Sequence, residues 1–142
     1  MNFIDKAMEE KAHMSPDDFL QAMADIYNEP EVWKILDKYP QFIQDVIYII
    51  DYDTILQMEG LDFFVCDKEE NVDHTITALN NCGAAKEANI LIDAKKLSLN
   101  NDLEEDDYYE EVSALEKETT LYNDDEYEVF WDCVRRYIEM NY

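Results

Sequence analysis

The stretch PQFIQDVIYIIDYDTILQM, residues 40–58, decides the fold of this chain. In its middle the apolar residues fall on most sides of a helix, which is typical of a helix buried in a core. Its β-branched residues raise the alternative of a strand. The apolar stripe continues to Met58, however, and this length favours a helix. Gly60 then breaks the pattern. The stretch therefore predicts a central, mostly buried helix.

The residues on both sides of this helix also repeat their apolar positions at helical spacing. Ser15-Pro16-Asp17-Asp18 marks a helix start, because serine caps, proline fits the first turn and acids favour the positive end of the dipole. Gly83 is well placed to end a helix in the left-handed conformation. The sequence predicts helices over residues 2–13, 16–27, 71–82, 84–97, 104–120 and 124–138, a helix opening at 30, a helical turn at 61–65 and an exposed loop near 99–107.

The sparse turn formers point to the same fold class. Two glycines and three prolines in 142 residues are too few for a many-stranded sheet and suit long helices with short connections. We predict an all-α fold, a single compact domain over residues 1–142 with seven or eight helices around the helix at about 40–58. Residues 1–38 are expected to form N-terminal helices that pack on residues 39–142.

The cysteines and the chain start indicate the compartment. The chain has an odd number of cysteines, Cys66, Cys82 and Cys133, and no two of them are spaced as C-x-x-C. This pattern is typical of free thiols in a reducing cytoplasm. Residues 1–10 lack the basic and apolar parts of a secretory signal. The strongly apolar run at 46–50 is far too short to span a bilayer. We expect a soluble cytoplasmic protein without membrane contact.

The charge of the chain limits the classes of molecule that can be its partners. Against 35 Asp and Glu stand only 11 Lys and Arg, which gives a net charge of −24, while 47% of the residues are hydrophobic. The chain is therefore a folded domain that carries a strong negative field. Such a field repels nucleic acids and anionic membranes and attracts proteins with basic faces.

Half of this charge lies in residues 102–128. The window holds thirteen acids and one base, Lys117, so its charge is −13 + 1 = −12. Carboxylates along a helix can stand at separations similar to those of backbone phosphates. The alternative is a solvated helix face, but ordinary helix surfaces intersperse basic residues and this one does not. The candidate partner-binding residues are Asp102, Glu104, Glu105, Asp106, Asp107, Glu110, Glu111, Glu116, Glu118, Asp124, Asp125, Glu126 and Glu128.

Two short patterns raise a metal-binding alternative. Residues 67–73 alternate oxygen ligands loosely like a calcium loop, but the pattern lacks the loop's glycine at the sixth position and its bidentate glutamate at the twelfth. Glu10 and His13 match only half of a di-iron motif. No phosphate-binding glycine loop or nucleophile–base pair is recognisable. We therefore expect no enzymatic activity, no metal site and no cofactor.

Residues from Tyr39 to the end carry packing motifs in a fixed order. They are Pro40 with the helix through Ile50, Tyr52-Asp53, Met58–Leu61, Phe63-Phe64, Thr77–Ala84, Ala88–Leu91, Leu115-Glu116, Tyr122, Asp124–Glu126 and Tyr137-Ile138. In this order they resemble the bacterial DNA-mimic protein family, the group around the neisserial DNA-mimic protein. The resemblance implies an all-helical fold and is compatible with DNA mimicry. Where the family has an asparagine and paired glycines, this chain has Met58, Glu59 and a single Gly60, and Phe63 stands in the place of the family's glutamine.

Together these features favour a non-catalytic acidic binding protein, and specifically a DNA mimic that occupies the basic face of a transcription factor or nucleoid protein. Asp67, Glu69, Glu70 and Asp73 are expected to assist the main cluster. Direct binding of nucleic acid or membrane is not expected. An immunity-type protein that neutralises a basic toxin or nuclease is the alternative, a metal-binding domain is the second, and a homodimer is left open.

Overall fold

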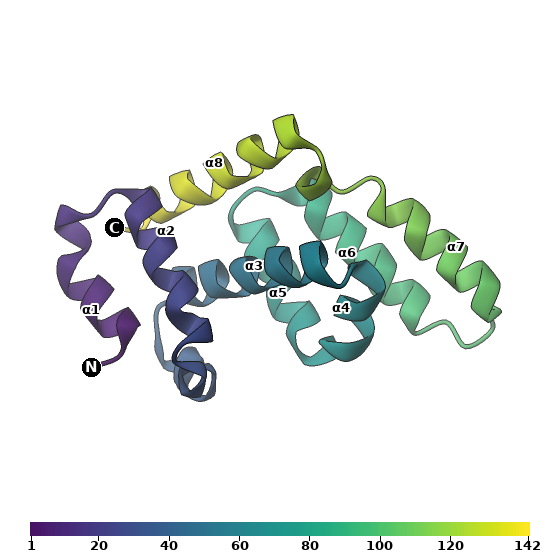
Figure 1. Cartoon of the computed structure of the whole chain (residues 1–142), viewed down its shortest axis with the longest axis horizontal. Helices are drawn as coiled ribbons and strands as arrows, with labels where there is room; N and C mark the ends of the chain where they lie inside the picture. Colours follow the sequence, from purple (N-terminus) through teal and green to yellow (C-terminus); the bar gives the residue numbers. More distant parts are fainter.

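The computed structural model describes all residues, 1–142, and contains helices and no strand (Figure 1). The all-α prediction is confirmed. The α-helices are α1 (Phe3–Glu10), α2 (Pro16–Met23), α3 (Gln41–Met58), α4 (Leu61–Asp67), α5 (Glu69–Asn81), α6 (Ala85–Ser98), α7 (Glu105–Glu116) and α8 (Asp124–Met140). The 3-10 segments are η1 (Lys11–His13), η2 (Ala24–Tyr27), η3 (Pro30–Lys38) and η4 (Thr120–Tyr122).

Helix α3 lies at the centre, as its apolar pattern predicts. It contacts α2, α4, α5 and α8, and Ile43, Ile47 and Ile49 are fully buried. Figure 1 shows α1 and α2 at one end of the molecule, α7 at the other, and α8 running back from the α7 side toward α2. None of these helices is both long and apolar enough to cross a membrane.

The predicted helices over 2–13 and 16–27 each end in a 3-10 segment, η1 and η2, and the structure differs from the predicted elements at three further places. The helix that opens at Pro30 is a 3-10 helix and ends before Pro40, where Tyr39 takes the extended conformation favoured before proline. The apolar segment after Gly60 forms a full helix, α4. Helix α7 ends at Glu116, before position 120, because Thr119 and Thr120 turn away to bind Glu87.

Both glycines adopt positive φ angles. Gly83 (φ +85°) follows α5, as predicted from its position. Gly60 has φ +94° and ψ 172°, a region that is essentially restricted to glycine. A Cβ at Gly60 would also lie 3.4 Å from a carboxylate oxygen of Glu116. The backbone conformation at position 60 therefore requires glycine.

Replacing Gly60 with alanine is expected to lower the free energy of unfolding by about 2 kcal/mol, because the side chain strains this backbone conformation. Gly83→Ala is the matched control, since a Cβ there meets nothing within 4 Å; we expect a cost of about 1 kcal/mol. Urea denaturation measures both. If Gly60→Ala were as stable as the parent, the backbone conformation at position 60 would not require glycine.

Tyrosine hydroxyls are the usual partners of the inner carboxylates. Seven of the ten tyrosines donate a hydrogen bond to an acid. The pairs are Tyr27–Asp51 (2.9 Å), Tyr39–Asp5 (3.0 Å), Tyr52–Glu87 (3.2 Å), Tyr108–Asp62, Tyr122–Glu116 (2.8 Å), Tyr127–Asp53 (2.9 Å) and Tyr137–Asp45. Since a hydroxyl adds no positive charge, the fold satisfies these acids while the chain keeps its negative charge.

Two of these acids make stability depend on pH. Burial raises the pKa of Asp51 and of Asp53 above the ordinary value of 3.8, although the hydroxyls of Tyr27 and Tyr127 oppose the shift. The folded state therefore holds these protons more tightly than the unfolded chain does. Their stabilising contribution is complete below pH 3.8 and is lost as pH rises through the raised pKa values.

We expect the double variant Asp51→Asn/Asp53→Asn to gain less stability on acidification than the parent, because an amide does not titrate in this range. The free energy of unfolding in urea, compared between about pH 7 and pH 3.8, measures the gain. The same gain in both proteins would exclude these two carboxyls as its source.

Candidate protein-binding acidic surface

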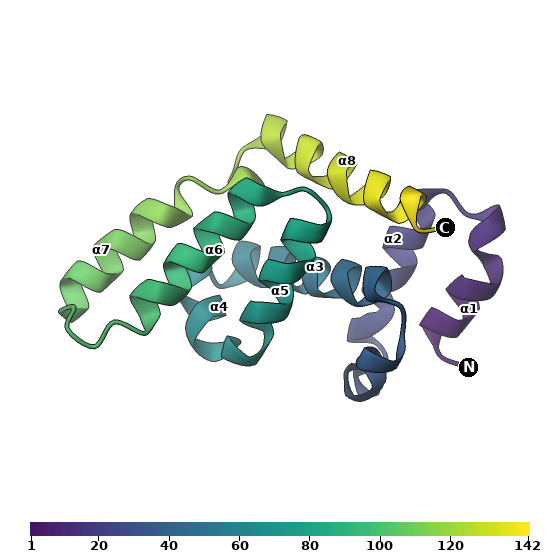
Figure 2. The same cartoon turned by 180° about the vertical axis from the view of Figure 1, so that it is seen from behind.

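The thirteen predicted acids lie on one continuous part of the chain. Asp102 and Glu104 precede α7, six acids belong to α7, Glu118 follows it, and the other four open α8. Figures 1 and 2 show α7 projecting at one end of the molecule, with α8 starting near its last turn. The predicted residues therefore follow a path from the tip of the molecule along α7 to the start of α8.

Local packing explains why this acidic segment folds as a helix. Tyr108, Val112 and Leu115 form one stripe, and α7 contacts α6 and α4. The Tyr108 hydroxyl donates to Asp62 of α4 and lies 3.4 Å from the Cys66 sulfur. Three acids in the first turn interact favourably with the positive end of the helix dipole. The stripe faces inward, so the remaining sides of α7 present acids to solvent.

Glu116 differs from the other twelve. Its carboxylate accepts a hydrogen bond from the Tyr122 hydroxyl (2.8 Å) and a longer one from the Leu61 backbone N–H (3.4 Å), and it is partly buried. It thereby joins the end of α7 to η4 and to the turn at Gly60. The structure uses Glu116 internally, so we define the acidic surface as the twelve exposed members of the predicted set without it.

Most of the acidic surface lacks internal partners. Glu126 pairs with Lys86 (3.5 Å) and Glu128 with Arg135 (3.9 Å). The side chains of the other ten make no hydrogen bond and no ion pair within the chain: Asp102, Glu104, Glu105, Asp106, Asp107, Glu110, Glu111, Glu118, Asp124 and Asp125. These ten carboxylates remain available to cations from outside the molecule.

The charge density along α7 is comparable with that of one DNA strand. Five of its twelve residues are exposed acids, Glu105, Asp106, Asp107, Glu110 and Glu111. At about 1.5 Å per residue the helix is roughly 18 Å long. One strand of B-DNA carries a phosphate about every 3.4 Å, or about five over this length. A protein face that binds one strand would therefore meet a similar number of negative charges on α7.

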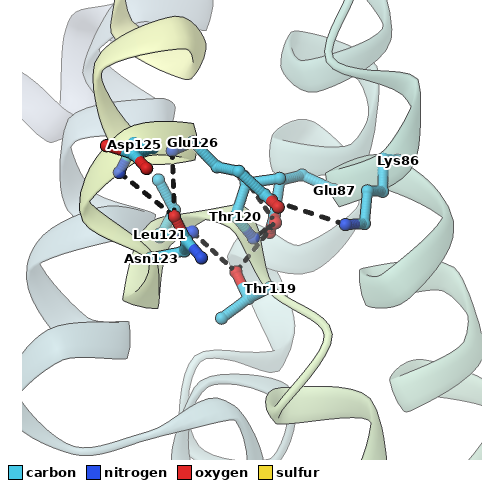
Figure 3. A network of polar contacts seen from close by, with 8 residues as sticks. All are labelled: Lys86, Glu87, Thr119, Thr120, Leu121, Asn123, Asp125 and Glu126. Atoms are coloured by element: carbon cyan, nitrogen blue, oxygen red, sulfur yellow. Dashed lines mark hydrogen bonds and ion pairs between the residues drawn. The ribbon is translucent and has the colours of Figure 1, made fainter.

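A buried glutamate fixes the junction between α7 and α8 (Figure 3). Glu87 of α6 is 1% exposed. It accepts hydrogen bonds from the Thr119 hydroxyl (2.8 Å), the Thr120 hydroxyl (2.8 Å) and the Thr120 backbone N–H (2.6 Å). The Tyr52 hydroxyl donates the fourth at 3.2 Å. Glu87 thus connects α6 and α3 to the segment that joins the two acidic helices.

The segment is also capped where α8 begins. The Asn123 side chain accepts hydrogen bonds from the backbone N–H groups of Asp125 (3.1 Å) and Glu126 (3.2 Å), and Lys86 reaches Glu126 from the side of α6 (Figure 3). The sequence did not predict the buried role of Glu87, because the residues around it look like those of an ordinary exposed helix. Its only signal is a position one residue before the buried Ala88 on the inner face of α6.

The four assisting acids lie apart from this path, at the end of α4 and on α5. Asp67, Glu69, Glu70 and Asp73 are all exposed. Asp73 pairs with Lys95 of α6. They enlarge the acidic area near α4, but they do not continue the row along α7.

The metal candidates do not form coordination sites. Residues 69–73 of the calcium-like pattern are helical, whereas such a loop must wrap around its ion. Glu10 and His13 are exposed at the end of α1 and in η1. No group of three or more His, Cys, Asp or Glu side chains is arranged to hold a metal ion. His74 instead stacks on Tyr48 with ring centroids 4.8 Å apart.

A comparison with protein families gives one match. The family described as DMP19-like protein matches residues 37–141, which include all helices from α3 to α8 and the whole acidic surface. No curated protein and no solved structure matches the chain.

Proposed function

Because the chain belongs to the DMP19-like protein family, the DNA-mimic family that its sequence resembles, we propose that its acidic surface occupies the DNA-binding face of a basic protein. In this proposal the protein is a non-catalytic binding protein. Its carboxylates take the places of phosphates and thereby exclude DNA from the partner.

The observation that carries the proposal is the set of ten exposed carboxylates without an internal partner. A row of unpaired charges increases the rate of encounter with a basic protein and favours complementary orientations. Salt screens these interactions, with a Debye length of about 8 Å at physiological ionic strength. Binding is therefore expected to weaken steeply as salt rises.

Affinity capture from a lysate of the source organism tests the proposal. The immobilised protein is loaded at low salt and eluted either with duplex DNA or with a salt gradient. DNA-binding proteins that duplex DNA releases support mimicry. A single partner that resists both salt and DNA would support the immunity-type alternative, in which one shape-specific toxin is neutralised.

A further inference from the structure

An apolar groove runs along α8, next to the acidic surface. One pocket of about 340 Å³ lies between the start of α6 and the first half of α8, and a second of about 550 Å³ lies between the end of α5 and the last turns of α8. Gly83 and Cys133 line both pockets, so the two pockets are adjacent parts of one groove. We call it the α8 groove and define it by Gly83, Ala84, Ala85, Val129, Cys133 and Met140.

The groove is unusually apolar for this molecule. Val129 is 61% exposed and Met140 is 84% exposed, and both lie on its α8 side. Figure 2 shows the connection between α5 and α6 beneath α8, and this connection forms the opposite wall. Exposed apolar residues that line a groove mark binding sites for partners, and methionine adapts to varied contacts.

The position and charge of the groove indicate its occupant. Asp125 and Glu126 line its first pocket and also belong to the acidic surface. Lys86, which pairs with Glu126, lines the same pocket, and Arg136 lines the second, so Asp125 is the acid of the lining that stays free for a partner. A partner held by these acids therefore reaches the groove without crossing other surface. Asp125 has no internal partner, and the chain as a whole carries −24, which favours a basic segment over a neutral or acidic one.

The dimensions suit a short helix. Eleven residues separate Val129 from Met140, which is roughly 16 Å, or about three helical turns. Apolar side chains at i, i+3, i+4 and i+7 of a bound helix span about 10 Å, so a groove of this length holds such a set. A second copy is disfavoured because α8 carries six acids and two arginines and would face its own negative charge.

We infer that the α8 groove binds an amphipathic basic helix of the protein partner, with its apolar side on Val129 and Met140 and its basic side next to Asp125 and Glu126. This inference rests on the proposed function. It adds a contact that depends on shape and apolar surface, whereas the acidic surface responds mainly to charge.

Two peptides of about 18 residues test the inference. The first places leucines at i, i+3, i+4 and i+7 among lysines, and the second has the same composition in scrambled order. Fluorescence anisotropy measures their affinities at physiological salt. We expect the parent to bind the amphipathic peptide about tenfold more tightly than the scrambled one, because both carry the same charge and only the first has an apolar side.

Val129→Glu is the decisive variant. It adds a negative charge, so an electrostatic account predicts tighter binding of basic peptides, whereas the groove predicts that the tenfold preference disappears. Leu99→Glu is the matched control, since Leu99 is also 61% exposed and lies beyond the far end of α6. It is expected to keep the preference.

Several results would overturn the inference that the α8 groove binds a helix. They are equal affinity of the parent for both peptides, an unchanged preference in Val129→Glu, an equal loss in Leu99→Glu, or a dimer of the parent that excludes the peptide and dissociates in Val129→Glu. Equal, salt-sensitive binding of both peptides leaves the acidic surface intact. Absence of binding by either peptide counts against the acidic surface as well.

Discussion

Neutralising four neighbouring acids of α7 is expected to weaken binding of the captured DNA-binding partner roughly 100-fold at low salt. The variant is Glu105→Gln/Asp106→Asn/Asp107→Asn/Glu110→Gln. Each exposed ion pair contributes on the order of 0.2–1 kcal/mol, so four together account for about 3 kcal/mol. The salt dependence of binding should become shallower because fewer charges take part. Titration calorimetry at several salt concentrations measures both effects.

A variant with the same change of net charge is the control. Glu9→Gln/Glu10→Gln/Glu31→Gln/Asp37→Asn neutralises four exposed acids that lie outside the acidic surface. At physiological salt we expect its affinity to stay within about threefold of the parent value, because exposed charges farther apart than the Debye length of about 8 Å are largely screened. Equal losses in the two variants would mean that overall charge, and not the acidic surface, attracts the partner.

Replacing Glu87 with alanine is expected to produce the largest loss of stability, about 4 kcal/mol. The change removes the acceptor of the buried Thr119 and Tyr52 hydroxyls and of both donors of the partly buried Thr120. Each unsatisfied buried donor costs about 1–3 kcal/mol, reduced where local rearrangement admits water. The free energy of unfolding in urea measures the loss.

Thr120→Val is the control for this prediction. It removes one of the four donors and keeps the branched shape, so the expected cost is about 1 kcal/mol. If Glu87→Ala stayed within about 1 kcal/mol of the parent, the buried carboxylate would not be what holds the junction of α7 and α8.

Local patterns in the sequence were sufficient to predict most of the α-helices. The apolar run of residues 40–58 identified α3, and the position of Gly83 identified the end of α5. Both signals act over a few residues, through helical periodicity and through the positive φ that glycine tolerates. The 3-10 form of η3 was not predicted, because the apolar spacing of such a short segment does not separate the two helix types.

The partners of the acids could not be predicted in the same way. Tyr137 reaches Asp45 across 92 residues and Tyr127 reaches Asp53 across 74. Such pairs depend on how the helices pack, which local spacing does not reveal. A signal was nevertheless present at Asp45, which stands within the apolar run and is fully buried, so a partner had to exist for it.

The acidic surface illustrates both cases. Its exposed row along α7 follows from composition and helical spacing alone. Glu116 has the same residue type and lies on the same helix, yet it binds Tyr122 and Leu61. Only the packed structure separates the acids that support the fold from the acids that remain available for a partner.

A displacement experiment tests the central claim most directly. The captured DNA-binding partner is first bound to a labelled duplex, and this protein is then added while fluorescence anisotropy follows the label. If the acidic surface occupies the DNA-binding face, the duplex is released in proportion to the protein added, and the four-acid variant releases none at the same concentrations. A ternary complex of duplex, partner and this protein, or a duplex that remains fully bound, would contradict DNA mimicry.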